Sequence, residues 1–350
     1  MAPRPLDLDR RRFLRLSGAA GGLALLAACG SGGDSGGSGG GFGKVAMQLS
    51  WVKNVEFGGQ YMADSRGYFT RAGFSGVDLL AGGAAGTSAE TALVTGRAWI
   101  GISAPLITAP AIAQGAELKV VGATFQKNPF AVISLEKAPI PDARSMIGKR
   151  IGVQDSNDIV WNALLKANGI DPAQVTRVPF QYDPTPITTG DVDGYIGYST
   201  SGAATLSRRG FPATQFLFAD NGLPLVGETL VVAQQTIDDE RDQLKAFLTA
   251  MARGWSDAVA EPAEAARLAT EVYGKDQNLD AGEQEAIMRR QIDLIVSPET
   301  QANGLLTVSD ELIAANMKAL GLAGIDMPAE QLFDLTPLRE VYRDNPGLGA

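Results

Sequence analysis

Residues 45–80 have the sequence VAMQLSWVKNVEFGGQYMADSRGYFTRAGFSGVDLL, and this stretch decides the expected fold. Its first part, 45–51, predicts a β-strand, because it is short, apolar and followed by polar residues. Residues 56–71 predict an amphipathic helix, and residues 77–80 predict a second strand. This strand–helix–strand order is typical of a parallel sheet covered by helices.

The same alternation continues along most of the chain. Further strands are expected at residues 98–102, 118–124, 130–135, 150–153, 176–180, 192–198, 215–218 and 228–233. After residue 233 the sequence is helical, with one apolar stripe formed by Leu244, Phe247, Leu248, Met251 and Trp255. The sequence therefore predicts an α/β protein.

The pattern indicates two doubly wound lobes. We expect lobe 1 to comprise residues 44–128 and 228–350, and lobe 2 to comprise residues 129–227, which include the hinge crossings. The crossings are expected at Phe130–Leu135 and Thr229–Ala233. A hinge that the chain crosses twice suits closure of two lobes around a ligand.

The first residues predict export and membrane anchoring. A basic run, Arg10-Arg11-Arg12-Phe13-Leu14-Arg15, precedes a short apolar stretch at 18–28, and residues 1–28 are expected to be a signal peptide. The basic run resembles a twin-arginine export motif. Leu26-Ala27-Ala28-Cys29 resembles the lipobox of bacterial lipoproteins, which implies lipidation of Cys29. Residues 29–43 would then be the lipidated cysteine and a flexible Gly/Ser linker. An ordinary signal peptide with an incidental cysteine is the alternative.

Composition excludes several classes of function. The chain has 350 residues and a formal charge of -9, and the signal segment carries more arginine than acidic residues, so the mature body is still more acidic. An acidic body argues against nucleic-acid binding. The sequence contains one cysteine and no histidine, which excludes an intramolecular disulfide, histidine metal sites and histidine-dependent hydrolase triads. We expect no enzymatic activity, no cofactor and no metal.

A ligand is expected beyond the carboxyl ends of the predicted strands, as in other open α/β sheets. The candidates are aromatic, amide, hydroxyl and carboxylate side chains, which suit a flat polar heterocycle. They are Trp51, Asn54, Glu56, Phe57, Tyr61, Ser103, Asp155, Asn157, Trp161, Tyr182, Asp183, Tyr195 and Tyr198.

Several candidates have a structural alternative. Phe57 and Tyr61 lie one helical turn apart and could equally be core residues. Asn157 could cap a helix. Tyr195 and Tyr198 should point to opposite faces of one strand, so we expect at most one of them to face the ligand. The glycine-rich turn at 82–86 lacks the first glycine of a dinucleotide fingerprint and is expected to hold at most an anion or a carbonyl oxygen near a helix N-terminus.

The chain resembles the NMT1/THI5-like (SsuA/THI5-like) substrate-binding lipoproteins of ABC transporters. The resemblance rests on Leu49-Ser50-Trp51-Val52-Lys53-Asn54-Val55-Glu56-Phe57-Gly58-Gly59-Gln60-Tyr61, followed by Gly67-Tyr68-Phe69, Gly148-Lys149-Arg150-Ile151-Gly152-Val153 and Val192-Asp193-Gly194-Tyr195-Ile196. It implies a type II periplasmic-binding-protein fold. It also implies that Trp51, Asn54, Phe57 and Tyr61 hold a heterocycle. Pyrimidine synthases of this family use a histidine and a cysteine-rich motif, which this chain lacks.

The expected function is that of an extracytoplasmic solute receptor of an ABC importer, binding a thiamine pyrimidine precursor or a riboflavin-like ring. Its expected partners are the small solute, the ABC permease subunits and the outer face of the bacterial cell membrane, reached through the lipid on Cys29. It is expected to be a monomer. A receptor for sulfonate, nitrate or taurine is one alternative, although Lys53 and Lys127 are the only nearby cations. A pyrimidine-synthase-like enzyme and a sensory co-receptor without an importer are the others.

Overall fold

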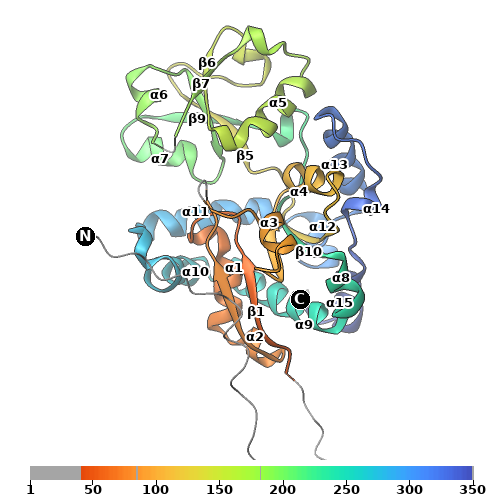
Figure 1. The fold of residues 1–350 in the computed structure, drawn as a ribbon. Helices are drawn as coiled ribbons and strands as arrows, with labels where there is room; N and C mark the ends of the chain where they lie inside the picture. Colours follow the sequence, from red (N-terminus) through yellow and green to blue (C-terminus); the bar gives the residue numbers. More distant parts are fainter. Residues whose placement is uncertain (1–40, 84–85, 182, 349–350) are drawn as a thin grey trace, which may run out of the picture. The chain divides into compact units, whose positions relative to one another are not determined.

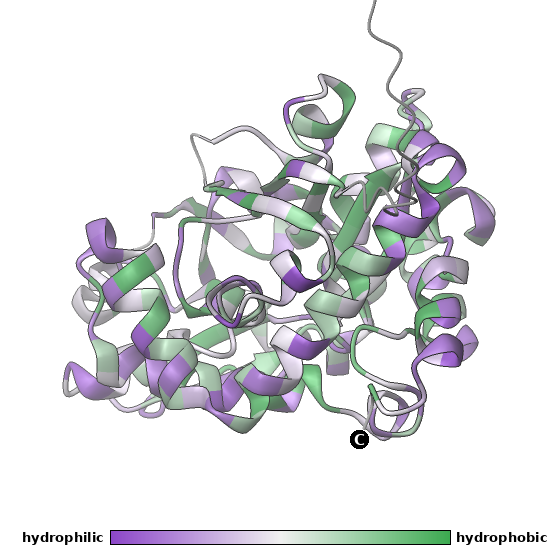
Figure 2. Ribbon diagram, turned by 90° about the horizontal axis from the view of Figure 1, so that it is seen from below, coloured by the Kyte–Doolittle hydropathy of each residue, from purple (hydrophilic) through white to green (hydrophobic). Residues whose placement is uncertain are grey.

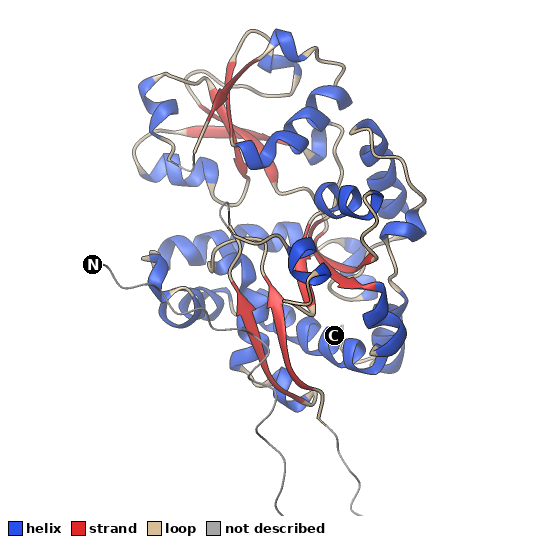
Figure 3. Cartoon of the chain, viewed as in Figure 1, coloured by secondary structure: helices blue, strands red, loops and turns tan. Residues whose placement is uncertain are grey.

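Two five-stranded sheets organise the protein in a computed structural model that describes residues 41–83, 86–181 and 183–348. Helices flank both sheets (Figure 3). The expected signal peptide, Cys29 and most of the Gly/Ser linker lie outside the described residues, as does Tyr182. In the part of the chain that is described, no helix combines the length and the apolar character needed to cross a bilayer.

The first sheet, which contains the strands labelled β1 and β10 in Figure 1, has the strand order β2-β1-β3-β10-β4. Parallel pairing joins β1 to β2 and β3, whereas β10 runs antiparallel to β3 and β4. β10 lies between two neighbours, which explains why six of its seven residues are buried. The bounds are β1 Gly43–Gln48, β2 Phe74–Leu80, β3 Ile100–Ser103, β4 Leu118–Phe125 and β10 Gly227–Ala233.

The second sheet repeats this plan with the order β7-β6-β8-β5-β9. β6 pairs in parallel with β7 and β8, and β5 runs antiparallel to β8 and β9. The chain therefore passes from the first sheet to the second after β4 and returns after β9. The bounds are β5 Phe130–Leu135, β6 Arg150–Val153, β7 Thr176–Pro179, β8 Gly194–Tyr198 and β9 Ala213–Leu217. The parallel strand pairs in both sheets, with helices on either side, confirm the predicted α/β fold.

The helices cover the sheets and fill most of the C-terminal third of the chain. They are α1 Gly58–Ser65, α2 Tyr68–Arg71, α3 Ala89–Val94, α4 Pro105–Ala113, α5 Asp158–Ala167, α6 Thr185–Thr189, α7 Gly202–Arg208, α8 Gln234–Asp239, α9 Arg241–Ala260, α10 Pro262–Arg267, α11 Ala281–Ile295, α12 Pro298–Asn303, α13 Asp310–Leu322, α14 Ala329–Leu332 and α15 Thr336–Asp344. Short helical turns lie at Val55–Phe57 (η1), Arg144–Met146 (η2), Asp155–Asn157 (η3), Pro172–Gln174 (η4), Ala219–Asn221 (η5), Leu268–Tyr273 (η6) and Lys275–Gln277 (η7).

The single helix expected at 56–71 is wrong. The structure has a short helical turn, η1, followed by α1 and α2. Gly67 separates the two helices with φ 67°, a left-handed conformation that favours glycine and ends a right-handed helix. The early turn, η1, begins after Asn54, whose side chain accepts a hydrogen bond from the Glu56 backbone.

The core of the first sheet is rich in aromatic side chains. Phe69, Phe74 and Phe247 pack with ring centroids 4.8 to 6.4 Å apart, and Trp99 lies against Phe247 at 5.5 Å. The predicted stripe from Leu244 to Trp255 forms the buried face of α9. Figure 2 shows the apolar residues gathered in the strands and inner helix faces, with polar residues on the outer helices.

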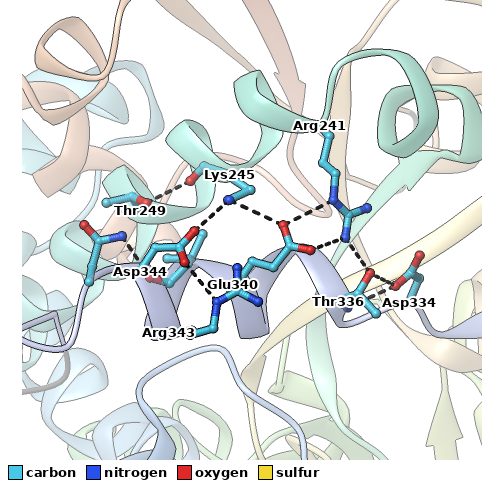
Figure 4. Close-up of polar contacts among 10 residues, drawn as sticks. Arg241, Lys245, Thr249, Asp334, Thr336, Glu340, Arg343 and Asp344 are labelled. Carbon is cyan, nitrogen blue, oxygen red and sulfur yellow. Dashed lines mark hydrogen bonds and ion pairs between the residues drawn. The ribbon is translucent and has the colours of Figure 1, made fainter.

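The last helix is attached to α9 by a row of ion pairs (Figure 4). Glu340 of α15 accepts hydrogen bonds from Arg241 at 2.8 and 3.2 Å and lies 3.4 Å from Lys245. Lys245 also contacts Asp344 at 2.8 Å. These groups are partly exposed, so water and salt weaken the pairs and each contributes little to stability.

Candidate functional site

A cavity of about 520 Å³ lies where the strand ends of the two sheets meet. Its volume is within the range of roughly 300–1,000 Å³ that small-molecule sites occupy. From the first sheet it is lined by residues after β1, at the end of β3 and at the start of β10. From the second sheet it is lined by residues after β6, at the end of β8 and at the start of β5. These residues include Ser50, Trp51, Ser103, Glu228, Gln154, Tyr198 and Phe130.

The structure brings seven of the predicted site residues to this cavity. They are Trp51, Asn54, Glu56, Ser103, Asn157, Tyr195 and Tyr198. Both tyrosines of β8 are among the lining residues, whereas the strand alternation predicted only one. Tyr198 is the last residue of β8, so it lies at the strand end that borders the cavity and is not limited to one face of the sheet.

Three predicted aromatic residues lie in the core and not among the lining residues. Phe57 and Tyr61 have no exposed surface, and Tyr61 stacks on Tyr273 with ring centroids 4.4 Å apart. Trp161 is 3% exposed and belongs to the core that α5 shares with the second sheet. The helical spacing that suggested Phe57 and Tyr61 is the spacing of a buried helix face.

Two predicted carboxylates lie on the surface. Asp155 pairs with Arg177 at 2.6 Å, and Asp183 pairs with Arg209 at 3.6 Å. Neither lines the cavity that the structure describes. Both are exposed, because each lies in a segment that leaves the second sheet before the next helix.

Asn54 and Asn157 line the cavity from helix starts, but only one of them caps its helix. The Oδ1 atom of Asn54 accepts a hydrogen bond of 2.7 Å from the Glu56 backbone N–H, which orders the segment that carries Glu56. Asn157 precedes α5, and its side chain makes no capping hydrogen bond. The side chain of Asn157 is therefore not committed to the helix end.

Two buried glutamates, Glu56 and Glu228, form a carboxyl pair in the cavity wall. They come from segments far apart in the sequence, and each is at most 9% exposed. The Oγ atom of Ser50 lies 3.0 Å from Oε2 of Glu228 and 3.4 Å from Oε1 of Glu56. The Tyr198 hydroxyl lies 3.5 Å from the other oxygen of Glu228. This tyrosine belongs to the second sheet, so the pair also contacts that sheet.

Both carboxyl groups have a raised pKa. Burial raises the pKa of Glu228 well above its ordinary value, and the charge of Glu56 raises it further. Burial also raises the pKa of Glu56, while the hydrogen bond from Glu228 opposes that rise. Glu228 therefore favours its protonated form more strongly than Glu56 does. Two ionised carboxylates that are buried side by side would repel each other strongly.

The backbone at Glu228 is unusual as well. Its φ is 47°, in the left-handed region where non-glycine residues are uncommon. Such a conformation costs about 1–3 kcal/mol and persists where the surroundings enforce it, which is frequent at binding sites. Glu228 is the second residue of β10, the strand by which the chain returns to the first sheet.

A third buried glutamate, Glu90, lines another part of the cavity from α3. Its Oε1 atom accepts hydrogen bonds from the hydroxyls of Ser103 and Thr108, the latter at 2.8 Å. Its Oε2 atom is buried without a hydrogen-bond partner among the described residues. The Oε1 atom of Gln154, in the wall formed by the second sheet, is buried without a partner in the same described set.

The described lining includes three glutamates and no lysine or arginine. Lys53 and Lys127, the two cations considered from the sequence, are not among these lining residues. No cluster of acidic or sulfur ligands suitable for a metal ion occurs in residues 41–83, 86–181 and 183–348. The described lining therefore combines acidic and neutral polar side chains with aromatic surface from Trp51, Phe130 and Tyr198.

Sequence reasoning missed Glu90 and Glu228. Glu90 occupies the first turn of a helix, where a carboxylate is ordinarily favourable and solvated. Glu228 begins a β-rich run, where an acidic residue is ordinarily an exposed end. The positive φ of Glu228 and its pairing with Glu56 arise from tertiary structure, so the sequence held no local signal for them.

The glycine-rich turn after β2 lies against the segment that carries Trp51. The Gly82 backbone N–H donates to the Trp51 carbonyl at 2.9 Å, and a Cβ atom at Gly82 would lie 2.4 Å from the Leu49 carbonyl oxygen. Only glycine fits this close approach. Residues 84–85 lie outside the described part, so anion binding by this turn stays a prediction.

Comparison with known proteins gives three informative relatives. The riboflavin-binding protein RibY of Chloroflexus aurantiacus is 25% identical over 304 residues, which cover 83% of this chain and 84% of RibY. The 4-amino-5-hydroxymethyl-2-methylpyrimidine phosphate synthase of Schizosaccharomyces pombe is 27% identical over 218 residues, covering 58% of this chain and 62% of the synthase. The aliphatic sulphonate binding protein SsuA of Escherichia coli superposes with a TM-score of 0.62 at 16% identity, covering 80% of this chain and 86% of SsuA.

The structural likeness establishes the periplasmic-binding-protein fold that the sequence predicted. The family model described as NMT1/THI5 like matches residues 54–265, which is more than half of the chain. This match includes the Asn54–Glu56 segment of the cavity wall and the Glu228 position. The chain belongs to the NMT1/THI5-like family.

Proposed function

We propose that this protein is an extracytoplasmic solute-binding lipoprotein of an ABC importer, and that it binds a flat nitrogen heterocycle in the cavity between its two sheets. The observation that carries the proposal is the cavity lining, which combines aromatic rings with three buried glutamates and no described cationic side chain. Aromatic faces suit a flat ring, and carboxyl oxygens suit ring-edge N–H groups. RibY, named as a riboflavin-binding protein, supports a heterocycle as the ligand class.

The lining disfavours the anion alternative. A sulfonate or nitrate ion would be placed beside buried carboxyl groups with no lysine or arginine among the described lining residues to balance its charge. The likeness to SsuA therefore supports the fold, whereas the side chains of this cavity support a different class of solute.

We propose a solute-binding protein and not an enzyme. The synthase of fission yeast is a relative, but the present sequence contains no histidine and a single cysteine. Two lobes, residues 44–128 with 228–350 and residues 129–227, would close on the solute. The lipid on Cys29 and the Gly/Ser linker would keep the receptor near its permease at the outer face of the membrane.

A ligand panel tests the proposal by thermal denaturation of the purified protein. The panel contains riboflavin, 4-amino-5-hydroxymethyl-2-methylpyrimidine and ethanesulfonate. A true ligand at 100 times its Kd stabilises the folded state by about 2.7 kcal/mol and raises Tm. We expect at least one heterocycle to raise Tm and ethanesulfonate to leave it unchanged. A shift with ethanesulfonate alone, or with none of the three, would overturn the heterocycle proposal.

A further inference from the structure

Helix α11 contacts both halves of the molecule, the half built on the first sheet and the half built on the second. Its buried residues Met288, Leu294 and Ile295 belong to the core of the first sheet. Its residues Glu283 and Arg290 contact α7 and the turn before α7, which pack on the second sheet. In Figure 1, α11 lies along the edge of the first-sheet half that faces α7.

Three polar contacts join α11 to the second-sheet half. The Oε1 atom of Glu283 accepts a hydrogen bond of 2.9 Å from the Thr205 hydroxyl and also pairs with the Arg208 guanidinium. The Nε atom of Arg290 donates to the Thr200 carbonyl. We call these five residues the α11–α7 latch. Thr205 also lines the cavity, so the latch adjoins the candidate ligand site.

The residues of α11 that form the latch lie beside residues that hold the cavity wall. Glu283 and Arg290 are seven positions apart in the sequence, about two helical turns, so they share one face of α11. Gln284 and Gln291 follow them by one position each. Gln284 accepts from the Val55 backbone N–H at 2.9 Å, and Gln291 donates to the Val55 carbonyl at 2.9 Å. α11 therefore fixes η1, which contributes to the cavity wall.

The C-terminal part of α11 holds the first connection between the sheets. The Gln126 backbone N–H, directly after β4, donates to the Leu294 carbonyl at 2.6 Å. One helix of about four turns thus contacts the cavity wall, the connection and the second-sheet half. Movement of the second-sheet half away from α11 has to break the latch.

The charge balance of the latch depends on Glu283. Burial lowers the pKa of Arg290, the charge of Arg208 lowers it further, and the charge of Glu283 opposes both effects. Arg208 and Arg290 come from different halves, so without Glu283 their like charges would push the halves apart. The Nη2 atom of Arg290 is buried with no partner among the described residues. That unpaired donor costs free energy, which offsets part of the latch and keeps opening possible.

We propose that the α11–α7 latch holds the two halves together in the ligand-free protein, and that Glu283 is its central positioning residue. The inference goes beyond the proposed function, because these contacts form without a solute. Glu283 and Arg290 are not among the described lining residues. Their role is to keep the second-sheet half close to the wall that α11 fixes. A receptor that is partly closed before binding loses less apparent affinity to its open form.

Charge reversal tests the latch by small-angle scattering of the purified ligand-free protein. Glu283→Lys removes the contacts to Thr205 and Arg208 and places a third cation beside two arginines. We expect the ratio of closed to open protein to fall by about tenfold or more, seen as a larger radius of gyration. An unchanged radius in folded Glu283→Lys would overturn the proposal.

A charge swap separates the latch from general damage to α11. Combining Glu283→Lys with Arg208→Glu restores an ion pair of the opposite sense, so we expect the radius of gyration to return towards that of the unaltered protein. A double variant as expanded as Glu283→Lys alone would overturn the pairing across the halves. A general loss of helix stability would not be rescued by a change on α7.

Glu285→Lys is the matched control on the same helix. Glu285 pairs with Arg289 of α11 at 2.6 Å, so its reversal disturbs a contact within the helix. We expect Glu285→Lys to leave the radius of gyration unchanged. Expansion equal to that of Glu283→Lys would show that any charge reversal on α11 has this effect, and would overturn the specific role of Glu283.

A milder variant keeps the test decisive if Glu283→Lys does not fold. Glu283→Gln removes the charge and retains an oxygen that can accept from Thr205, so we expect the closed-to-open ratio to fall by up to about fivefold. No change in the radius of gyration of Glu283→Gln would then overturn the latch. All of these measurements are made without solute, so they stand whichever compound of the ligand panel binds, and failure of that panel leaves them unaffected.

Discussion

The buried carboxyl of Glu228 makes the stability of the unliganded protein depend on pH. Its pKa is raised on folding, so above the pKa of an unfolded glutamate, about 4.3, the folded state holds more protons than the unfolded state. Stability attributable to this group is therefore lost as pH rises through that window. We expect Glu228→Gln, whose amide can still donate to Glu56, to melt at a higher temperature than the unaltered protein at pH 8.

The matched measurement is the same pair of proteins at pH 4. There the carboxyl is protonated in the folded state and about two-thirds protonated in the unfolded state, so the advantage of the glutamine should largely vanish. Thermal denaturation at several pH values gives the difference directly. A difference in Tm that is constant from pH 4 to pH 8 would contradict the raised pKa of Glu228.

Trp51 provides the second prediction at this scale. It is half-buried and lines the cavity directly after β1. Replacing it with alanine removes stacking of about 0.5–1.5 kcal/mol and the apolar area that the indole covers. We expect Trp51→Ala to weaken heterocycle binding by about tenfold or more, as measured by calorimetry.

The control for Trp51 is a tryptophan away from the cavity. The Trp99 side chain packs against Phe247 and donates to Glu240 at 3.1 Å, and it is not a lining residue. Trp99→Phe should lower Tm without changing affinity. If both variants lost affinity equally, the loss would reflect general destabilisation and not stacking.

Among the elements, α1 and α9 pack so closely that glycine is required at the contact. A Cβ atom at Gly254 of α9 would lie 2.2 Å from the Gly59 carbonyl oxygen and 2.8 Å from the Ala63 backbone nitrogen. Alanine ordinarily favours a helix over glycine by up to about 1 kcal/mol. Here the backbone clash outweighs that gain, and we expect Gly254→Ala to destabilise the protein by about 1–3 kcal/mol.

Gly321 in α13 is the matched control. A Cβ atom there meets nothing within 4 Å, and the residue is exposed. Gly321→Ala should therefore leave stability unchanged or raise it by up to about 1 kcal/mol. Urea denaturation of both variants measures the two free energies of unfolding. Equal effects at the two positions would show that helix propensity, and not the α1–α9 contact, dominates.

Most elements could be predicted from the sequence because their signals are local. The strands at 130–135 and 150–153 have the predicted bounds, since apolar residues and flanking turns define them. Asp280 caps α11, and its side chain accepts a hydrogen bond of 2.7 Å from the Glu283 backbone N–H. The break at Gly67 was missed, because the apolar spacing continues across it.

The candidate site was less predictable, because it depends on which segments meet. Trp51 and Ser103 could be found as residues that follow parallel strands. Pairing of Glu56 with Glu228 requires β10 to return to the first sheet between β3 and β4, which no local pattern specifies. Burial of Phe57 and Tyr61 depends equally on helices from distant parts of the chain.

For the whole molecule, the cavity geometry predicts closure on ligand. The chain passes between the two sheets after β4 and after β9, and the cavity takes its walls from both. Tyr198 of the second sheet lies 3.5 Å from Glu228 of the first. A ligand can shift the balance between open and closed forms only through its higher affinity for one of them. The proposed ring, held between Trp51 and Tyr198, would contact both walls and so favour the form that brings them together.

We therefore expect small-angle scattering to give a smaller radius of gyration when a saturating heterocycle is added. Trp51→Ala, at a ligand concentration that saturates it equally, should show a smaller change, because one of the two contacts that reward closure is missing. Reaching a 99:1 closed population from a 1:99 one requires about 10⁴-fold preference for the closed form, and loss of a stacking contact of about 0.5–1.5 kcal/mol lowers the ratio of closed to open protein by about two- to twelvefold. An identical change in both proteins would show that the Trp51 contact does not drive closure, and that the groups around Glu228 supply its free energy instead.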